Sequence, residues 1–201
     1  PPPTPPPPPA PRKNLPLAPP APAAKPMSKD QEQATLNFKL NWAAWHGNLE
    51  ETKTLLAAGG DPNWLNRDGV PALSAALGHH VGNYRDTIKL LIDSKADVDR
   101  LDTKGRAPIL HAAKAGLAEQ LKQLLDAGAK QVDTVTSDKQ SGLLLAVRDR
   151  RADIASMLLA ARANPHLANK NGGTPVAAVR KMKGPEHAEL RKLFARELGE
   201  L

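Results

Sequence analysis

Apolar residues recur along the chain in two kinds of short segment, and the two kinds alternate. The first kind is rich in alanine and opens on an apolar residue, and these opening residues are Leu40, Leu73, Ile109, Leu143 and Val176. The second kind has apolar positions at i, i+4, i+7 and i+8, most completely in Tyr84, Ile88, Leu91, Ile92 and in Leu117, Leu121, Leu124, Leu125. That spacing places the four side chains on one face of a helix. The pattern therefore predicts pairs of helices, one rich in small residues and one amphipathic.

The paired segments repeat at a nearly constant period. Their opening residues follow one another at steps of 33, 36, 34 and 33 residues. Two short helices cannot bury their shared apolar face alone, so neighbouring pairs must cover it, and a fixed period in this range is typical of stacked units. We therefore expect an all-α solenoid over residues 31–201, with five units at approximately 37–65, 66–101, 102–135, 136–168 and 169–201. The last unit has a helix start at Pro185 and a charged outer face, as a terminal unit requires.

Short motifs between the predicted helices resemble those of the ankyrin repeat. Residues 102–109 and 169–176 are similar to the family's opening motif, Asp-x-x-Gly-x-Thr-Pro-Leu, and residues 55–63 are similar to its closing Leu-Leu helix and Gly-Ala-Asp-x-Asn turn. The resemblance covers about residues 37–198. It implies a solenoid of stacked helix-turn-helix units with short β-hairpin-like fingers. It also implies a non-catalytic protein–protein interaction module that binds its partner through a concave groove.

The chain departs from the family's pattern at several places. The histidine of the Thr-Pro-Leu-His motif is replaced in every unit, so the hydrogen bond from that ring is expected to be missing throughout; the residues found there are Asn41, Ser74, Leu110, Leu144 and Ala177. The fourth unit has Lys139 in place of the finger glycine, and the third has residues 130–133 in place of the closing Asp-x-Asn. Three extra residues in the second unit place residues 78–83 in a longer loop between its helices. Trp42 lies beside the first alanine pair, and we predict that it points into the stack.

Residues 1–30 have a different composition, and we expect them to form a proline-rich disordered arm. Fourteen of the twenty prolines lie within residues 1–26, where the sequence has no apolar periodicity. Proline fixes φ and removes a backbone donor, so such a segment is expected to be an extended, semi-rigid polyproline II spacer. Residues 13–19 also fit the basic-x-Leu-Pro-x-x-Pro pattern of ligands for proline-reading domains. The alternative to groove binding is therefore a tethered adaptor whose arm is the ligand of a proline-reading or envelope partner.

Composition and charge narrow the classes of partner. The net charge of +7 is divided into +3 for residues 1–30 and +4 for the remainder, so the predicted folded part is too mildly basic to favour nucleic acid. The chain has no cysteine, and it has no run of about 18 apolar residues that would indicate membrane insertion. We expect a monomer. A first residue other than methionine, followed by a long proline-rich spacer, favours an exported or periplasmic bacterial protein over a cytoplasmic one.

No residue pattern indicates catalysis, a cofactor or a metal site. His79 and His80 are the one adjacent pair among six histidines, and consecutive side chains point apart with no carboxylate at i+4. The sequence has no His-Glu-x-x-His motif, no Gly-x-Ser-x-Gly motif and no phosphate-binding glycine loop. We therefore predict that the protein is not an enzyme and needs no cofactor.

The resemblance also implies which residues face the concave groove. The positions after each alanine pair and beside each finger glycine give a set of candidate partner-binding residues: Trp45, His46, Trp64, Arg67, His79, Lys104, Arg106, Lys114, Arg148, Lys170 and Lys181. This set is aromatic at its N-terminal end and basic from the third unit onward. It predicts a protein partner with an apolar anchor beside an acidic stretch. In a second interpretation, Trp45 and Trp64 only cover the exposed flank of the first unit.

Overall fold

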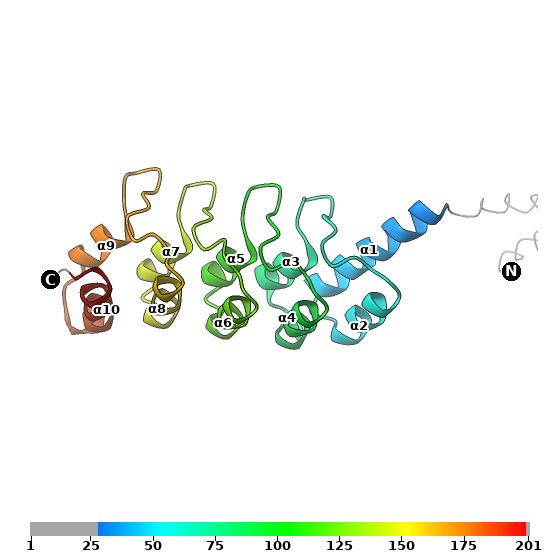
Figure 1. Cartoon of the computed structure of the whole chain (residues 1–201), viewed down its shortest axis with the longest axis horizontal. Coiled ribbons are helices and arrows are strands. Elements are labelled where there is room, and N and C mark those ends of the chain that lie inside the picture. Colours follow the sequence, from blue (N-terminus) through cyan, green and yellow to red (C-terminus); the bar gives the residue numbers. More distant parts are fainter. Residues whose placement is uncertain (1–27, 200–201) are drawn as a thin grey trace, which may run out of the picture.

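The computed structural model describes residues 28–199 as a row of stacked helix pairs (Figure 1). No strand occurs in this part of the chain, so the all-α solenoid is confirmed. The helices are α1 (Lys29–Trp45), α2 (Leu49–Ala57), α3 (Ala72–His79), α4 (Tyr84–Asp93), α5 (Pro108–Ala115), α6 (Ala118–Asp126), α7 (Gly142–Arg148), α8 (Ala152–Ala160), α9 (Pro175–Lys181), the 3-10 helix η1 (Pro185–His187) and α10 (Ala188–Leu198). The predicted arm over residues 1–30 lies, up to residue 27, outside the described residues.

The helices form two rows. The first helices of the units (α1, α3, α5, α7, α9) lie beside one another, and the second helices (α2, α4, α6, α8, α10) lie in a row beneath them (Figure 1). The core runs between the rows, where the residues that open the alanine-rich segments are at most 6% exposed. Finger loops join each unit to the next and project to one side (Figure 1). None of the helices in the described part is both long and apolar enough to cross a membrane.

The alanine pairs set the spacing between neighbouring first helices. Ala113 on α5 is 2% exposed, and α5 packs on α3 and on α7. A Cβ atom added to Gly142, at the start of α7, would lie 3.2 Å from the Cβ of Ala113, so the two backbones are already in close contact. There is no space at this position for a larger side chain.

We expect the substitution Ala113→Leu to lower the free energy of unfolding by about 1.5 kcal/mol, because overpacking a dense core forces side chains and backbone apart. Chemical denaturation followed by circular dichroism measures the change. The matched control is Ala127→Leu, at an exposed position after α6, where we expect a change within about 0.5 kcal/mol. Equal stability of the two variants would contradict the packing described for α5 and α7.

Each finger loop is held by a polar residue at its first position. The side-chain oxygens of Asn66, Asp102 and Asn169 each accept hydrogen bonds from the backbone N–H groups two and four residues later. In the fourth unit Thr136 takes this position, and its hydroxyl accepts from the N–H of Gln140. These loops are closed by backbone hydrogen bonds, as the predicted hairpin-like fingers require.

The two irregular motifs of the fourth and third units keep the geometry of the other units. Lys139 has φ +56°, the left-handed conformation that Gly69, Gly105 and Gly172 adopt at the same place in the other fingers. In the third unit the carboxylate of Asp133 accepts the backbone N–H of Asn164 at 2.8 Å. The chain therefore compensates for the missing glycine and for the altered closing turn without losing the period.

Carboxylate and amide oxygens also link the closing turns of successive units. Asn63 accepts the N–H of Asp97 at 2.8 Å, and Asp99 accepts the N–H groups of Lys130 and Gln131. The bond from Asn164 to Asp133 is the third step of the same series. We call Asn63, Asp99 and Asp133 the turn ladder. Each of its members ties one unit to the backbone of the next.

Trp42 does not point into the stack, and that prediction was wrong. Its side chain is 54% exposed, whereas Leu40 and Ala44 on the same helix are fully buried. Each helical residue advances by about 100°, so Trp42 lies roughly opposite Leu40, while Ala44 returns to the buried face. The alanine pair indicates where the helix lies along the sequence, but it does not determine which face of the helix is buried.

Three smaller expectations also change. Helix α1 begins at Lys29, two residues before the expected boundary, with Ser28 as its N-cap. Gly78 and His79 belong to α3, so the longer loop of the second unit is limited to residues 80–83. Although the histidine ring is missing at position 41, Asn41 replaces its hydrogen bond, because its amide donates to the carbonyl of Val70 at 2.9 Å.

Candidate functional site

A row of exposed and half-buried rings lies at the N-terminal end of the solenoid, along α1. The rings of Phe38 and Trp42 stack with centroids 6.4 Å apart, and those of Trp42 and Trp45 stack at 5.5 Å. His46 lies against both tryptophans, at 4.2 Å and 4.3 Å. The row continues onto the next unit, because Trp45 is 4.1 Å from the ring of His79 on α3. We call these five residues the aromatic surface.

Helical periodicity places these side chains together. Phe38, Trp42, Trp45 and His46 occupy positions i, i+4, i+7 and i+8, which form a single stripe on one face of a helix. This is the spacing that predicts the buried faces of the second helices, yet here Phe38 is 45% and Trp42 54% exposed. Phe38 and Trp42 were missed as surface residues, although the stripe itself is readable in the sequence.

The aromatic surface borders a hollow of about 400 Å³ between α1, α3 and the first finger. Phe38, Trp42, Trp45 and His79 form its apolar side, and its polar side is formed by Asn41, Asn66, Arg67 and Asp68. The amide of Asn66 donates to Asn41 at 3.0 Å, which fixes the finger against α1. A ligand in this hollow would therefore meet rings on one side and a charged, firmly held finger on the other.

His79 of the aromatic surface favours its neutral form at neutral pH, because its pKa is lowered. Burial lowers the pKa of His79, and the neighbouring imidazoles of His80 and His46 lower it further. An uncharged ring packs on Trp45 without a buried positive charge. His79 consequently adds no charge to this surface at neutral pH.

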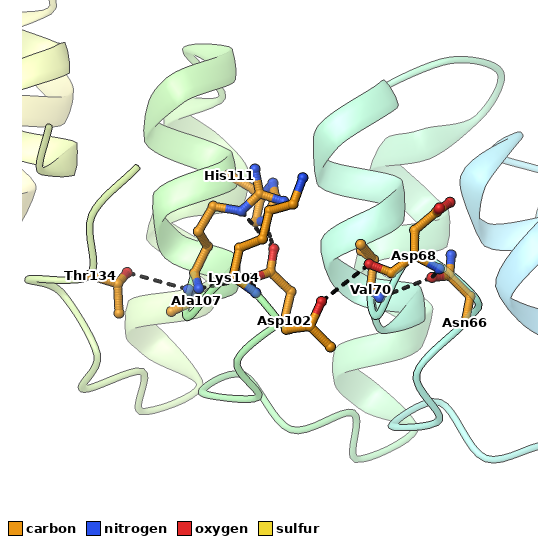
Figure 2. A network of polar contacts seen from close by, with 10 residues as sticks. Asn66, Asp68, Val70, Asp102, Lys104, Ala107, His111 and Thr134 are labelled. Atoms are coloured by element: carbon orange, nitrogen blue, oxygen red, sulfur yellow. Dashed lines mark hydrogen bonds and ion pairs between the residues drawn. The ribbon is translucent and has the colours of Figure 1, made fainter. Parts of the chain in front are cut away.

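A second polar centre lies at the base of the second finger, around Asp102 (Figure 2). The Asp102 side chain is 1% exposed and pairs with Arg106 at 2.7 Å; His111 Nε2 lies 3.3 Å from the same oxygen. Burial by itself would raise the pKa of Asp102, but hydrogen bonds from Arg106 and from the Lys104 backbone outweigh it and hold the pKa below its usual value. Burial and then the charge of Arg106 lower the pKa of His111, while Asp102 opposes them. This centre joins finger to helix, so its role is structural.

The candidate residues divide into two groups in the structure. Trp45 contacts both His46 and His79, and Arg67 lines the hollow beside Trp45. Trp64 is half-buried and does not line this hollow. The six basic candidates from the third unit onward are spread over fingers and first helices, with Lys104 and Arg106 on one finger: Lys104, Arg106, Lys114, Arg148, Lys170 and Lys181.

The basic candidates differ in whether an acidic side chain of the same chain already pairs with them. Arg106 is committed to the buried Asp102, and Lys170 lies 3.3 Å from the exposed carboxylate of Asp138. Arg148 donates to the neutral side chain of Gln140 and keeps its net charge. Lys114 is exposed in the last turn of α5. Lys114 and Arg148, like the exposed Lys104 and Lys181, therefore keep a charge that could meet an acidic partner.

No group of three or more His, Asp or Glu side chains within the described residues is arranged to hold a metal ion. The oxygens of the buried Asp102 carboxylate already accept hydrogen bonds from Lys104 and Arg106. The hollow beside α1 is lined by rings, amides, Arg67 and a single acidic side chain, Asp68. The groups that this surface presents can stack, form hydrogen bonds and carry charge.

Comparison with known proteins agrees with the repeated fold. A family model described as "Ankyrin repeats (3 copies)" matches residues 40–136 and, in a second overlapping match, residues 76–171. The chain is 31% identical over 125 residues to "Ankyrin repeat and SAM domain-containing protein 6" of Danio rerio, a match that covers 61% of this chain and 16% of that protein. It is 30% identical over 169 residues to "Putative palmitoyltransferase ZDHHC13" of Danio rerio, which covers 82% of this chain and 25% of that protein.

A third match is with "Ankyrin repeat and KH domain-containing protein mask" of Drosophila melanogaster, at 31% identity over 112 residues, or 55% of this chain and 3% of that protein. The chain thus spans a quarter or less of the length of these relatives. What they share with it is the repeat array.

Proposed function

The chain belongs to the ankyrin-repeat family and is a protein–protein interaction module, and we propose that it binds its partner on the surface formed by the first helices and the finger loops. This family is generally non-catalytic, and we propose the same for this chain. We expect it to bind as a monomer. The observation that carries the proposal is the aromatic surface, where large rings remain exposed beside a hollow.

Exposed aromatic rings at one end of a repeat array favour a partner with an apolar anchor. Trp42 and Phe38 are about half exposed, and Trp45 is held between His46 and His79. Aromatic residues of this kind dominate the binding energy of interfaces, because they bury a large area at a low cost in conformational entropy. A partner side chain that enters the hollow would contact Trp42 and Trp45 together.

Charge extends the proposed surface beyond the aromatic end. Lys114 and Arg148 are exposed on α5 and α7, and no acidic side chain within the described residues pairs with either. Such cations attract an acidic stretch of a partner during encounter more than they add to the final affinity. We therefore propose a partner with an apolar anchor for the hollow and acidic residues beyond it.

We expect the double substitution Lys114→Glu, Arg148→Glu to slow association about tenfold at low salt, because steering by complementary charge acts on the on-rate. The dependence of that rate on salt should become flatter. Stopped-flow or surface plasmon resonance measurements with a partner recovered by pull-down from the native source would show both effects. The control is Lys53→Glu, Lys122→Glu, which makes the same charge change on the second helices α2 and α6. If the control slowed association equally, the effect would come from the change in net charge and not from the positions of Lys114 and Arg148.

A second function is favoured by one observation in the sequence, the pattern of residues 13–19, which lies outside the described residues. In this alternative, the arm is the ligand of a proline-reading or envelope partner. Replacing Pro16 and Pro19 with alanine separates the two functions. Partner binding would persist if the aromatic surface is used and would be lost if the arm is the ligand.

A further inference from the structure

Rings and indole N–H groups of the aromatic surface are available for contact with a ligand. Trp42 and Phe38 keep about half of their surface exposed. Within residues 28–199, no hydrogen bond uses the indole N–H of Trp42 or Trp45. A ligand that fits this surface must offer flat apolar faces and hydrogen-bond acceptors at the same time, because an indole presents a ring and a donor.

A proline-rich segment of the same chain meets this requirement. Residues 1–26 contain fourteen prolines and are joined to α1, the helix that carries the rings, through Met27 and Ser28. Proline has no N–H donor, but its carbonyl accepts hydrogen bonds and its ring packs on aromatic faces, as in aromatic-lined grooves that bind polyproline II helices. We propose that residues 1–26 dock on the aromatic surface of their own molecule.

The distance from Ser28 to the rings along α1 matches the reach of the proline-rich arm from Ser28. Trp45 is 17 residues after Ser28, which corresponds to about 26 Å along a helix. Pro19 is nine residues before Ser28, which corresponds to about 28 Å in a polyproline II helix. A fully extended segment that folds back along α1 therefore brings Pro19 level with Trp45, and a turn within residues 20–27 brings Pro16 and Pro19 over the ring stripe. The run at residues 5–9 reaches the same rings with chain to spare.

The spacing of the rings on α1 also matches the spacing of the prolines in a polyproline II helix. Phe38 and Trp45 are seven residues apart on α1, or about 10 Å along its axis. One turn of polyproline II is three residues and about 9 Å, so Pro16 and Pro19 can contact the two ends of the ring stripe at once. At the edge of the hollow, Asp68 forms no ion pair within the described residues and can accept from Lys13.

Tethering makes such docking effective even when the contacts are weak. A short linker holds the arm at a local concentration in the millimolar range, so an affinity of only about 1 mM leaves the surface covered about half of the time. The consequence for partner binding rests on the proposed function. The arm would compete with the partner's apolar anchor for Trp42 and Trp45, and it would raise the partner concentration needed for binding.

The chain has no cysteine, so a single label can be placed at will. The test uses the full chain with Trp64→Phe, which leaves Trp42 and Trp45 as reporters, and a nitroxide attached at Ala18→Cys. The nitroxide quenches tryptophan emission on close approach. We expect about a twofold loss of emission relative to the reduced, diamagnetic label, in line with half occupancy. The matched control carries the nitroxide at Ser137→Cys, on the exposed third finger, and should lose none.

Three outcomes would overturn the proposal. Unchanged emission with the label at position 18 would show that the arm does not dock. Quenching that persists after replacement of all fourteen prolines of residues 1–26 with serine would show a contact that does not recognise proline. Quenching that disappears on dilution would mean that a second copy of the chain supplies the segment. No outcome involves the partner protein, so failure here is distinct from failure of the proposed function.

Discussion

Replacing Asp102 with alanine is expected to lower the free energy of unfolding by about 3 kcal/mol, the largest effect of any single substitution in the fingers. The substitution leaves the backbone N–H groups of Lys104 and Arg106 without the acceptor that they share. It also removes the partner of the Arg106 guanidinium and the acceptor of His111. Urea denaturation followed by circular dichroism at pH 7 measures the loss.

The conservative substitution Asp102→Asn is the matched control. Asn66 and Asn169 hold their own fingers with the same pair of backbone bonds, so an amide can serve at this position. We expect a loss of only about 1 kcal/mol, for the ion pair. Because the folded-state pKa of Asp102 is lowered, the advantage of aspartate is fully present above about pH 4 and is lost as the pH falls below it. An advantage that grows toward acid pH would contradict the assignment.

The second large effect concerns binding. We expect Trp45→Ala to weaken partner binding about 30-fold, equivalent to about 2 kcal/mol, because Trp45 is the ring that connects α1 to His79 on α3. Isothermal titration calorimetry with the recovered partner measures the loss. Unchanged circular dichroism would show that the helices remain folded.

Trp64→Ala is the control for this experiment. Trp64 belongs to the predicted partner-binding set, but it does not line the hollow beside Trp45. We expect its replacement to weaken binding less than fivefold, that is, by under about 1 kcal/mol. If Trp64→Ala had the larger effect, the partner would use the outer face of the first finger and not the hollow.

The architecture could be predicted because its signals are periodic. Five apolar residues at nearly constant steps locate the first helices, and the i, i+4, i+7, i+8 pattern locates the second ones. The irregular third and fourth units could not be resolved in this way. In the fourth unit Lys139 adopts the left-handed conformation that glycine adopts elsewhere, and in the third unit the carboxylate of Asp133 accepts the hydrogen bond that links it to the next unit. Neither role can be inferred from the residue type alone.

The surface was harder to predict than the fold. The positions of Trp45, His46 and His79 follow from the repeat register, and the ring of Trp45 lies against both imidazoles. Whether these residues bind a partner stays a prediction. Trp42 was assigned to the core because a ring beside an alanine pair is usually buried, and only the rotation of α1 shows that it faces outward. Whether Lys104, Lys170 or Lys181 contacts a partner stays a prediction, because a repeat register shows where a side chain lies and not what it binds.

The turn ladder has a consequence for how the array comes apart. Stability in a repeat array is a sum of unit and interface terms, and the interfaces decide whether all units melt together. Two of the three ladder contacts are single bonds, whereas the carboxylate of Asp99 holds two backbone N–H groups of the following unit. The second and third units should therefore behave as one thermodynamic block, while melting that starts from either end would progress inward and stop at this junction before global unfolding.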